Sequence, residues 1–205
     1  MGDIVYIQRI KQDLSFLKYN RKDLKQISFL KDIENDKGIT KYIHNIAKDI
    51  ELSEFRNSHI TGMLVKDNTI DEYIGVCTIK PAFYDITAAP VEYAVHEKYR
   101  FSNKKYGSHI LLSISDLLFL NDNYSKIVLE IKGSNTPSIK AATNARFTVD
   151  FGLAEVFNNE GYDYVPYSLC NRNYTQGRSK TLNNWKGWKL WSTILLELKV
   201  PEWVP

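Results

Sequence analysis

The sequence VEYAVHEKYRFSNKKYGS, residues 91–108, decides the fold. Residues 91–96 have the pattern of a strand, and a polar loop then leads into a strongly amphipathic segment. From Ser108 onward the apolar residues recur with the 3.6-residue period of a helix face: Ile110, Leu111, Ile114, Leu117 and Leu118. We therefore expect a strand, a loop and a long helix in succession, with the helix ending at Asn121.

The junction between this loop and the helix is a candidate phosphate site. The first amide N–H groups of a helix have no partner within the helix, and the helix dipole adds partial positive charge there. Gly107 would let a ligand approach the backbone closely, while Arg100, Lys104 and Lys105 add positive charge. The alternative is an ordinary capped turn with solvated lysines, because many strand–helix junctions bind nothing.

Outward from this junction, strand-like and helix-like runs alternate. Before it we expect a strand at 4–10, one or two helices within 14–33, a helix from an N-cap at Thr40 to about 55, and an antiparallel hairpin of 60–66 and 73–80. After it we expect a strand at 127–131, a helix at 135–145 with Pro137 in its first turn, and a closing hairpin of 151–157 and 162–167. This order predicts a mixed α/β, α+β-like class, with a twisted, mostly antiparallel central sheet flanked by helices.

The chain is interpreted as a single domain over residues 1–205, with its core at 60–167 and a C-terminal extension at 168–205. Its prolines and glycines fall mostly near element boundaries, and no linker or repeat divides it. In the extension, Trp185, Trp188 and Trp191 lie three apart and are interpreted as a packed stripe rather than a ligand platform. This aromatic segment packs either on its own core or on a second subunit, so a homodimer is one arrangement that we consider.

Composition argues against several classes of protein. The hydrophobic fraction is 43%, the charged fraction 25% and the formal net charge +3, with Lys and Arg interleaved among Asp and Glu, which argues against nucleic acid as a partner. Cys77 and Cys170 have no spacing that suggests a metal site, so we expect no metal. No stretch reaches the roughly 18 apolar residues of a membrane span, and the first ten residues lack the pattern of a signal peptide, so a cytoplasmic location is the default.

Three ordered pieces of the sequence resemble the acetyl-CoA core of the GNAT N-acetyltransferase family. They are Glu72-Tyr73-Ile74-Gly75, the strand and turn of 91–100, and the loop of 103–108 that opens a long helix. Downstream, Asn135-Thr136-Pro137-Ser138 is similar to the family's Asn-x-x-Ser/Ala helix start. The resemblance covers about residues 60 to 157, and the Asn-x-x-Ser form is similar to the branch that acetylates protein N-termini, including ribosomal proteins, and some small amines.

The loop admits two alignments with the family pattern Arg/Gln-x-x-Gly-x-Gly/Ala. If Gly107 is the last glycine, Lys105 replaces the inner glycine and Ser102 stands at the Arg/Gln position. In the other alignment Arg100 is the family arginine, and Phe101 and Ser102 are a two-residue insertion.

Two further departures from the family pattern lie in the downstream helix. Arg146 replaces the usual glycine before Phe147, and Ala142 stands where many members carry a tyrosine general acid. The altered loop and Ala142 motivate an alternative function, that of a catalytically silent relative that binds acyl-CoA or a partner protein. A third hypothesis, a nucleic-acid-associated protein, predicts binding with a steep salt dependence and no need for CoA.

The resemblance implies acetyl-CoA as cosubstrate and direct acetyl transfer to a primary amine of a small molecule or a protein N-terminus. The pyrophosphate would lie beside Arg100, on the amides of the loop and the helix start: Asn103, Lys104, Lys105, Tyr106, Gly107 and Ser108. Amides near the end of the preceding strand would hold the acetyl carbonyl oxygen: Ala94, Val95 and His96. Asn135 would contact the pantetheine arm, and Ser138 would protonate the leaving thiolate.

Glu92 is the first candidate for the base that takes a proton from the amine, because it lies on the strand beside the expected acetyl group. Strand side chains alternate between the two faces, so the alternative is that Glu92 points to solvent. His96 is interpreted as a structural histidine, and Glu130 is a weaker candidate for the base. The acceptor itself has no motif, since specificity in such folds lies in variable loops and helices.

Overall fold

The computed structural model describes residues 4–9, 12–55, 58–82, 85–120, 124–159 and 163–171, a few of them by their backbone alone. The strands within these residues form one sheet in the order β1-β2-β3-β4-β5-β6-β8-β7. Their bounds are β1 (Ile4–Arg9), β2 (Gln12–Lys18), β3 (Thr61–Asp67), β4 (Glu72–Ile79), β5 (Ala88–Val95), β6 (Lys126–Lys132), β7 (Thr148–Val149) and β8 (Tyr164–Cys170). The helices are α1 (Leu24–Asn35), α2 (Lys37–Thr40), α3 (Ile46–Leu52), α4 (Glu97–Arg100), α5 (Tyr106–Leu120), α6 (Thr136–Asn144) and α7 (Phe151–Asn159).

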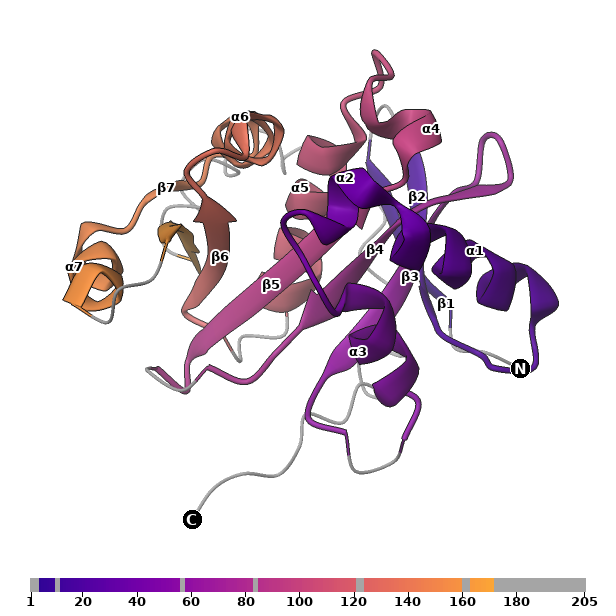
Figure 1. Ribbon diagram of the computed structural model, residues 1–205, viewed down its shortest axis with the longest axis horizontal. Helices are drawn as coiled ribbons and strands as arrows, with labels where there is room; N and C mark the ends of the chain where they lie inside the picture. The colour runs from indigo at the N-terminus through magenta and orange to yellow at the C-terminus, as the bar shows by residue number, and fades with distance from the viewer. Residues whose placement is uncertain are drawn as a thin grey trace.

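Helices cover both faces of this sheet. Helices α1, α2 and α3 lie on one face, and α5 lies on the other (Figure 1). Ile33 and Ile50 pack with Val76 on the first face, whereas Ile110 and Ile114 of α5 are fully buried in the core of the second. All neighbouring strands are antiparallel except β5 and β6. The predicted mixed α/β class with a mostly antiparallel sheet is confirmed.

The parallel pair β5 and β6 separates part-way along its length. Ala88, Ala89 and Pro90 pair with residues 126–128 of β6, and beyond Pro90 these two fully described strands form no further pairs. The ribbons accordingly part from one another toward the ends of the two arrows (Figure 1). We call residues 91–95 of β5 and 129–132 of β6 the strand divergence. It leaves the inner edges of two strands without a hydrogen-bonding neighbour in the middle of the sheet.

The elements around the divergence follow the sequence pattern closely. The hairpin of β3 and β4, the strand β5, the long helix α5, the strand β6 and the helix α6 all occur where they are predicted. Pro137 lies in the first turn of α6, where its missing N–H removes no helical hydrogen bond. The one-turn helix α4 is an addition to the prediction, and the polar loop of residues 101–105 that follows it leads directly to α5.

The N-terminal prediction is wrong in two places. Residues 12–18 form β2 and not a helix, because Leu14 and Phe16, two residues apart, lie on one face of the strand and are buried against the rest of the sheet. The helix was predicted because Leu14 and Leu17 lie three residues apart, as on a helix face. Thr40 ends α2 instead of capping a helix, and the next helix, α3, begins only after Asn45. The side chain of Asp36 supplies the cap of α2.

The predicted closing hairpin is also wrong in its first half. Residues 151–159 form the helix α7, because Asp150 accepts the Leu153 amide with its side chain and the Ala154 amide with its carbonyl, as a helix N-cap does. The two-residue strand β7 pairs with β8 in place of the expected partner. The tryptophan stripe of the C-terminal extension lies outside the described residues. None of the helices in the described part of the chain combines the length and apolar character needed to span a bilayer.

Candidate active site

The backbone of β5 faces the strand divergence with alternate residues. The Pro90 carbonyl accepts a hydrogen bond from Lys80 N at 3.0 Å, and His96 N donates to Ile74 O at 3.0 Å, so the even-numbered residues bond to β4. Alternation therefore turns the amides of Tyr93 and Val95 toward β6, which has already moved away. Three strand-end amides are predicted to hold the acetyl carbonyl oxygen. The Val95 amide points into the divergence, whereas the amides of Ala94 and His96 point to β4.

The N-terminus of α5 lacks a side-chain cap from its own N-cap residue. The Lys105 carbonyl accepts the first helical hydrogen bond, from His109 N at 3.2 Å, which makes Lys105 the N-cap. A lysine side chain has no acceptor atom. By contrast, α1, α2, α4 and α6 are capped by acceptor side chains: Asp23, Asp36, His96 and Asn135. The amides of Tyr106, Gly107 and Ser108 therefore receive no acceptor from the Lys105 side chain, and this helix start is a candidate anion site.

A buried carboxylate holds this helix end and its loop against β3. Asp67 is fully buried, and its Oδ2 accepts from Tyr106 Oη at 2.5 Å and from Lys104 Nζ at 3.2 Å. Its Oδ1 accepts from the Thr69 amide and hydroxyl. Burial alone would raise the pKa of the Asp67 carboxyl, but these hydrogen bonds outweigh it, and its pKa is lowered. The charge of Lys104 is thereby partly neutralised before any phosphate arrives.

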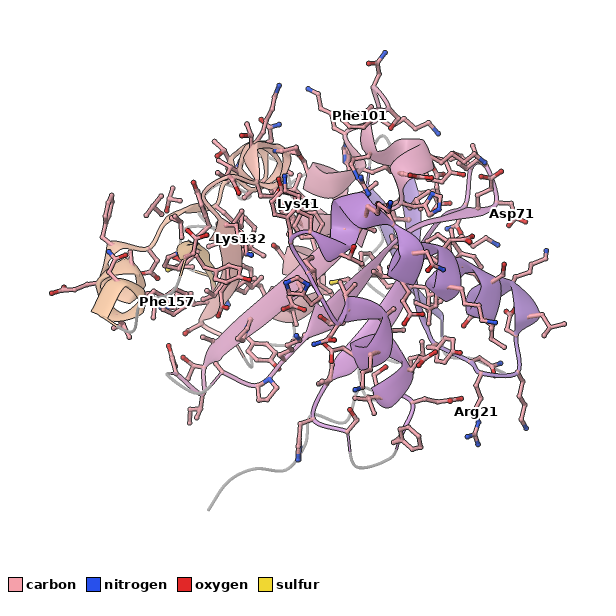
Figure 2. All side chains as sticks on the ribbon, in the orientation of Figure 1. Arg21, Lys41, Asp71, Phe101, Lys132 and Phe157 are labelled. Atoms are coloured by element: carbon pink, nitrogen blue, oxygen red, sulfur yellow. The ribbon has the colours of Figure 1, made fainter. Side chains whose placement is uncertain are left out.

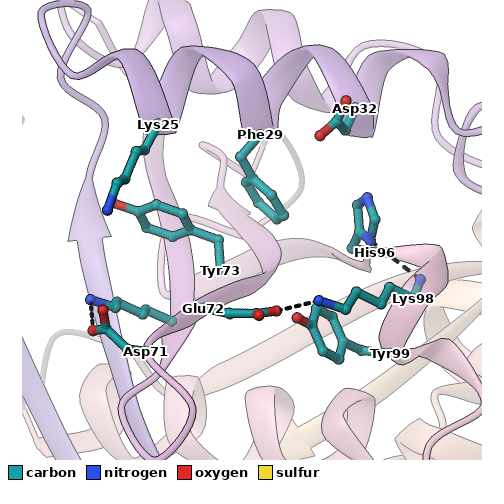
Figure 3. Close-up of a pocket in the computed structure, with 10 residues that line it drawn as sticks. Lys25, Phe29, Asp32, Asp71, Glu72, Tyr73, His96, Lys98 and Tyr99 are labelled. Carbon is teal, nitrogen blue, oxygen red and sulfur yellow. Dashed lines mark hydrogen bonds and ion pairs between the residues drawn. The ribbon is translucent and has the colours of Figure 1, made fainter.

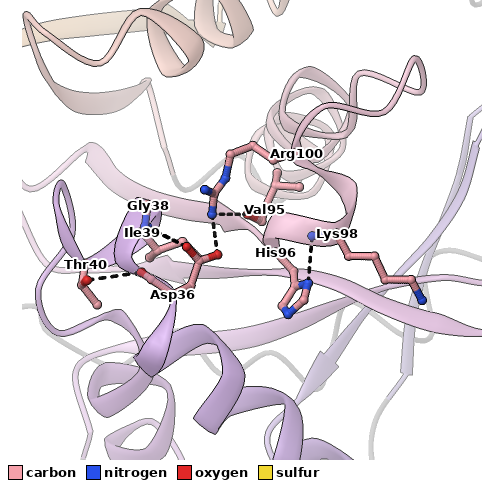
Figure 4. Close-up of polar contacts among 8 residues, drawn as sticks. All are labelled: Asp36, Gly38, Ile39, Thr40, Val95, His96, Lys98 and Arg100. Atoms are coloured by element: carbon pink, nitrogen blue, oxygen red, sulfur yellow. Dashed lines mark hydrogen bonds and ion pairs between the residues drawn. The ribbon is translucent and has the colours of Figure 1, made fainter.

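Arg100 is engaged elsewhere than in the loop. Its Nη2 lies 2.5 Å from Asp36 Oδ2 and 3.3 Å from Val95 O, so the guanidinium joins α2 to the end of β5 (Figure 4). Gly38 makes room for it, because a Cβ there would lie 2.0 Å from Arg100 Nη1. A phosphate contact from Arg100 would have to compete with this ion pair.

Ser138, in the first turn of α6, lies across the divergence from β5. Tyr93 Oη donates to Ser138 Oγ at 3.3 Å, and the Ser138 amide donates to Asn135 Oδ1, which caps the helix. Gly107 adjoins the same group, since a Cβ there would lie 3.2 Å from that of Ala141 and 3.4 Å from the Tyr93 ring. Burial raises the pKa of Tyr93 to about 12, although the bond with Ser138 acts in the other direction. Its hydroxyl therefore keeps its proton at neutral pH.

Glu92 lies on the opposite face of the sheet from Ser138. Its side chain is 35% exposed, and Oε2 is 2.8 Å from Lys80 Nζ, which lies equally far from Asp49 Oδ2 on α3. Glu92 thus neither points freely to solvent nor stands alone beside the divergence. Because Lys80 pairs with both carboxylates, it connects Glu92 of β5 to Asp49 of α3.

His96 and its surroundings form a separate hollow. The His96 side chain accepts from Lys98 N at 3.3 Å, and its ring lies 5.7 Å from that of Phe29. Beside it, α1, α4 and the β3–β4 hairpin enclose about 370 Å³ (Figure 3). Four of the charged side chains that line this hollow form ion pairs, Lys66 with Asp71 and Lys98 with Glu72 at 2.6 Å. The hollow lies on the β3–β4 side of β5, away from β6. Among the described residues, no group of three or more His, Cys, Asp or Glu side chains is arranged to hold a metal ion.

Comparison with known proteins identifies the fold. No protein-family model matches the chain, and no curated protein matches its sequence. Among solved structures, a GNAT-family acetyltransferase from Bacillus anthracis matches with a TM-score of 0.61 and 14% identity, over 82% of this chain and 99% of that one. The fold is that of the GNAT acetyltransferases. Aminoglycoside acetyltransferase AAC(6')-Ib with CoA and kanamycin matches with a TM-score of 0.63 and 14% identity over 80% of this chain and 99% of that one. Spermidine N-acetyltransferase from Vibrio cholerae with CoA and spermine matches with a TM-score of 0.61 and 13% identity, over 79% of this chain and 98% of that one.

Two positions where the GNAT pattern has glycine keep a glycine-like backbone here. Lys105 has φ 52° and Arg146 has φ 72°, both in the left-handed region that glycine adopts without strain. At Arg146 this geometry ends α6, with Phe147 N bonded to Ala142 O and Arg146 N to Thr143 O. The φ of Lys105 favours the alignment in which it replaces the inner glycine, and the ion pair of Arg100 with α2 agrees with that choice.

Sequence reasoning missed three residues of this region. Tyr93 reads as an inward-facing strand residue, but its contact with Ser138 joins positions 45 apart in the chain. Asp67 reads as a turn residue of the β3–β4 hairpin, and nothing local connects it to Tyr106. Lys80, at the end of β4, carries no signal for its contact with Glu92 beyond the opposite charge.

Proposed function

We propose that the protein is an acetyl-CoA-dependent N-acetyltransferase that acts on a primary amine of a small molecule or a protein N-terminus. The observation that carries the proposal is the strand divergence, which opens beside the start of α5, where the N-cap residue is Lys105. An extended arm can add to the free edge of β5 by hydrogen bonding as a strand would. A phosphate at the other end of that arm would meet the amides of Tyr106, Gly107 and Ser108. The AAC(6')-Ib structure holds CoA and kanamycin, and the spermidine acetyltransferase structure holds CoA and spermine.

One orphaned hydroxyl supports a phosphorylated ligand at the start of α5. Ser102 Oγ, in the loop before α5, is buried and has no hydrogen-bond partner within the described residues. Buried hydroxyls without partners are costly, by about 1–3 kcal/mol each, and a ligand oxygen or water beside them would remove that cost. The residues present therefore fit the phosphate end of acetyl-CoA.

The chain's own groups divide the chemistry between the two faces of the sheet. Acetyl-CoA supplies an activated acetyl group, whose C–S bond breaks as the C–N bond to the acceptor forms. Glu92, on the α3 face, would take the proton that the acceptor nitrogen loses. The Val95 amide would donate to the acetyl carbonyl oxygen. The Ser138 hydroxyl accepts a hydrogen bond from Tyr93, so its own proton remains available for the leaving sulfur. Ser138 would then regain a proton from solvent, and Glu92 would release the proton it took from the amine to solvent.

Thermal denaturation with acetyl-CoA, CoA or ATP, followed by CoA release in the same samples, tests this proposal. A ligand at about a hundred times its dissociation constant adds roughly 2.7 kcal/mol of stability. Lys105→Glu brings negative charge to the α5 amides and should abolish the shift, whereas Lys31→Glu makes the same charge change on an exposed position of α1 and should keep it. A shift with acetyl-CoA but no CoA release with any amine would favour the alternative, a catalytically silent acyl-CoA-binding relative.

The remaining expectations belong to the same proposal. They are a cytoplasmic location, one domain, either a monomer or a homodimer, and no nucleic-acid partner. Light scattering reports the mass in solution, and a salt titration with a DNA duplex would expose nucleic-acid binding by its steep salt dependence.

A further inference from the structure

The α3 face of the divergence carries a polar group of side chains that the proposed transfer uses only in part. Lys80 Nζ lies 2.8 Å from both Asp49 Oδ2 and Glu92 Oε2, with 31% of its side chain exposed. Thr78, opposite Glu92 on β4, is fully buried, and its Oγ1 has no partner within the described residues. A buried hydroxyl without a partner beside a charged pair indicates space for a polar ligand or for water.

Glu130 completes this group from the other side of the divergence. Pro90 is the partner of Val128, so two residues farther along the parallel strands Glu92 and Glu130 are level with each other. Both point to the α3 face, because their neighbours Tyr93 and Leu129 belong to the core under α5. Glu130 is an exposed residue of β6, and partial desolvation of its carboxyl together with the negative charge of Glu92 raises its pKa, while the positive charge of Lys80 opposes this change.

The charges of this face do not balance. Asp49, Glu92 and Glu130 are three carboxylates, and Lys80 is their one close cation in the described residues. Lys132, the next residue of β6 on this face, holds its ammonium over the Tyr164 ring at 5.5 Å from the centroid. Lys126 is paired with Asp150 at 3.2 Å. No side chain of the described residues forms an ion pair with Glu130, and a carboxylate surplus beside a partly desolvated site attracts cations.

We propose that Glu130 determines acceptor specificity by holding a second ammonium group of the acceptor, which makes diamines and larger polyamines the preferred class. This inference rests on the proposed function. The reacting nitrogen lies at Glu92, and the distal ammonium lies at Glu130 on the other strand. Glu92 is then needed for the transfer itself, whereas Glu130 is needed only for acceptors with a second charge.

A matched pair of acceptors separates these roles. 1,4-Diaminobutane and 4-amino-1-butanol have the same length, but only the first carries a second ammonium. The protein should prefer the diamine by about fivefold or more in kcat/KM, as expected for one partly exposed ion pair. Glu130→Gln should raise KM for the diamine about fivefold, leave kcat unchanged and leave both constants unchanged for the amino alcohol. Glu155→Gln, on the exposed side of α7, should behave as the unchanged protein.

Calorimetry with 1,4-diaminobutane and no acetyl-CoA keeps this test independent of turnover. Diamine binding that is weaker in Glu130→Gln supports the specificity role of Glu130. If acetyl-CoA does not bind in the same protein, the proposed acetyl transfer is wrong and the specificity role stands. Turnover with equal kcat/KM for the two acceptors, or diamine binding that Glu130→Gln leaves unchanged, overturns the specificity role while the acetyl transfer stands. The specificity role is also overturned if calorimetry detects no binding of 1,4-diaminobutane and the kinetic assay detects no turnover of it.

Discussion

The hydroxyl of Tyr106, the first residue of α5, donates a hydrogen bond to the buried carboxylate of Asp67, the last residue of β3, with 2.5 Å between the oxygens. The same carboxylate oxygen accepts from Lys104 in the loop before α5. A single side chain therefore fixes the helix end and the loop on which the proposed phosphate site depends. Its removal should affect both stability and cosubstrate binding.

Asp67→Asn should lower the free energy of unfolding by about 2 kcal/mol, because an amide replaces the charged acceptor and leaves a buried hydroxyl poorly paired. That loss corresponds to a fall in melting temperature of roughly 4–8 °C for a chain of this size. It should also weaken the acetyl-CoA-induced shift. Asp71→Asn, in the neighbouring turn, is the control, because Asp71 is exposed and its one ion pair within the described residues is with Lys66 (Figure 2).

The pH dependence of this effect has a definite sign. The pKa of Asp67 is lowered by its hydrogen bonds, so its contribution is present above the unfolded-state pKa near ~4 and disappears as pH falls through the folded-state pKa. The difference in melting temperature between the unchanged protein and Asp67→Asn should therefore be constant from pH 7 to about 5 and narrow below about 4. A difference that widens in acid would contradict the assignment.

Lys105→Gly should stabilise the protein, because φ 52° is strained for lysine and relaxed for glycine. The expected gain is about 1 kcal/mol, reduced by the greater freedom of glycine in the unfolded chain. Lys105→Ala removes the same charge without relieving the backbone and should be neutral or slightly destabilising. Equal melting temperatures for the glycine and alanine variants would mean that residue 105 carries no strain. Arg146→Gly, at φ 72°, is a second and independent test of the same argument.

Much of the fold was predictable from local pattern. The α5 stripe, the β3–β4 hairpin and the Asn-capped α6 each follow from periodicity or capping within a short stretch. The prediction for residues 12–18 was wrong because two spacings fit the same residues. Leu14 and Leu17 have the spacing of a helix face, and Leu14 and Phe16 have the spacing of a strand face. Only the pairing of β2 with β3 decides between them. Residues 151–157 failed for a similar reason, since the cap from Asp150 outweighs an apolar run.

The candidate site was predictable as a location more than as a set of contacts. The junction of β5, the loop and α5 is predicted as a candidate site from its positive charge, its glycine and its helix start. The partners that define each side chain's state are distant in sequence: Asp36 from Arg100 by 64 residues, and Asp67 from Tyr106 by 39. Glu130 illustrates the limit most clearly, because its importance depends on the register of two strands that pair at only three positions.

The ion pair between Arg100 and Asp36 should contribute more to stability than any surface pair of this protein. Only 1% of the Asp36 side chain and 22% of the Arg100 side chain are exposed. Arg100→Met leaves a buried carboxylate with two amide donors and no counter-ion, which should lower the free energy of unfolding by about 2–3 kcal/mol.

Lys98→Met is the matched control for this ion pair, since Lys98 is paired with Glu72 at an exposed position and its loss should change stability by at most about 0.5 kcal/mol. Chemical denaturation measures both variants. Equal effects of the two substitutions would contradict the role of the buried pair.

Ser138→Ala should lower kcat of the acetyl transfer by about 10- to 100-fold, as expected when a proton donor in the transition state is lost. KM for acetyl-CoA should change little, because the backbone amides that bind it remain. Tyr93→Phe removes the hydrogen bond that turns the Ser138 proton toward the leaving group and should lower kcat by about two- to tenfold. Because the pKa of Tyr93 is raised to about 12, neither variant should alter the pH profile between 6 and 10.

The double variant distinguishes a shared role from two separate ones. If Tyr93 acts only through Ser138, adding Tyr93→Phe to Ser138→Ala should reduce kcat no further. Thr143→Ala, on the exposed side of α6, is the control for disturbance of the helix, since the Thr143 hydroxyl donates to the Ile139 carbonyl of its own helix. A fully additive loss in the double variant would mean that Tyr93 contributes to transfer by a route that bypasses Ser138. An unchanged kcat in Ser138→Ala would remove Ser138 from the proton path and leave protonation of the sulfur to solvent.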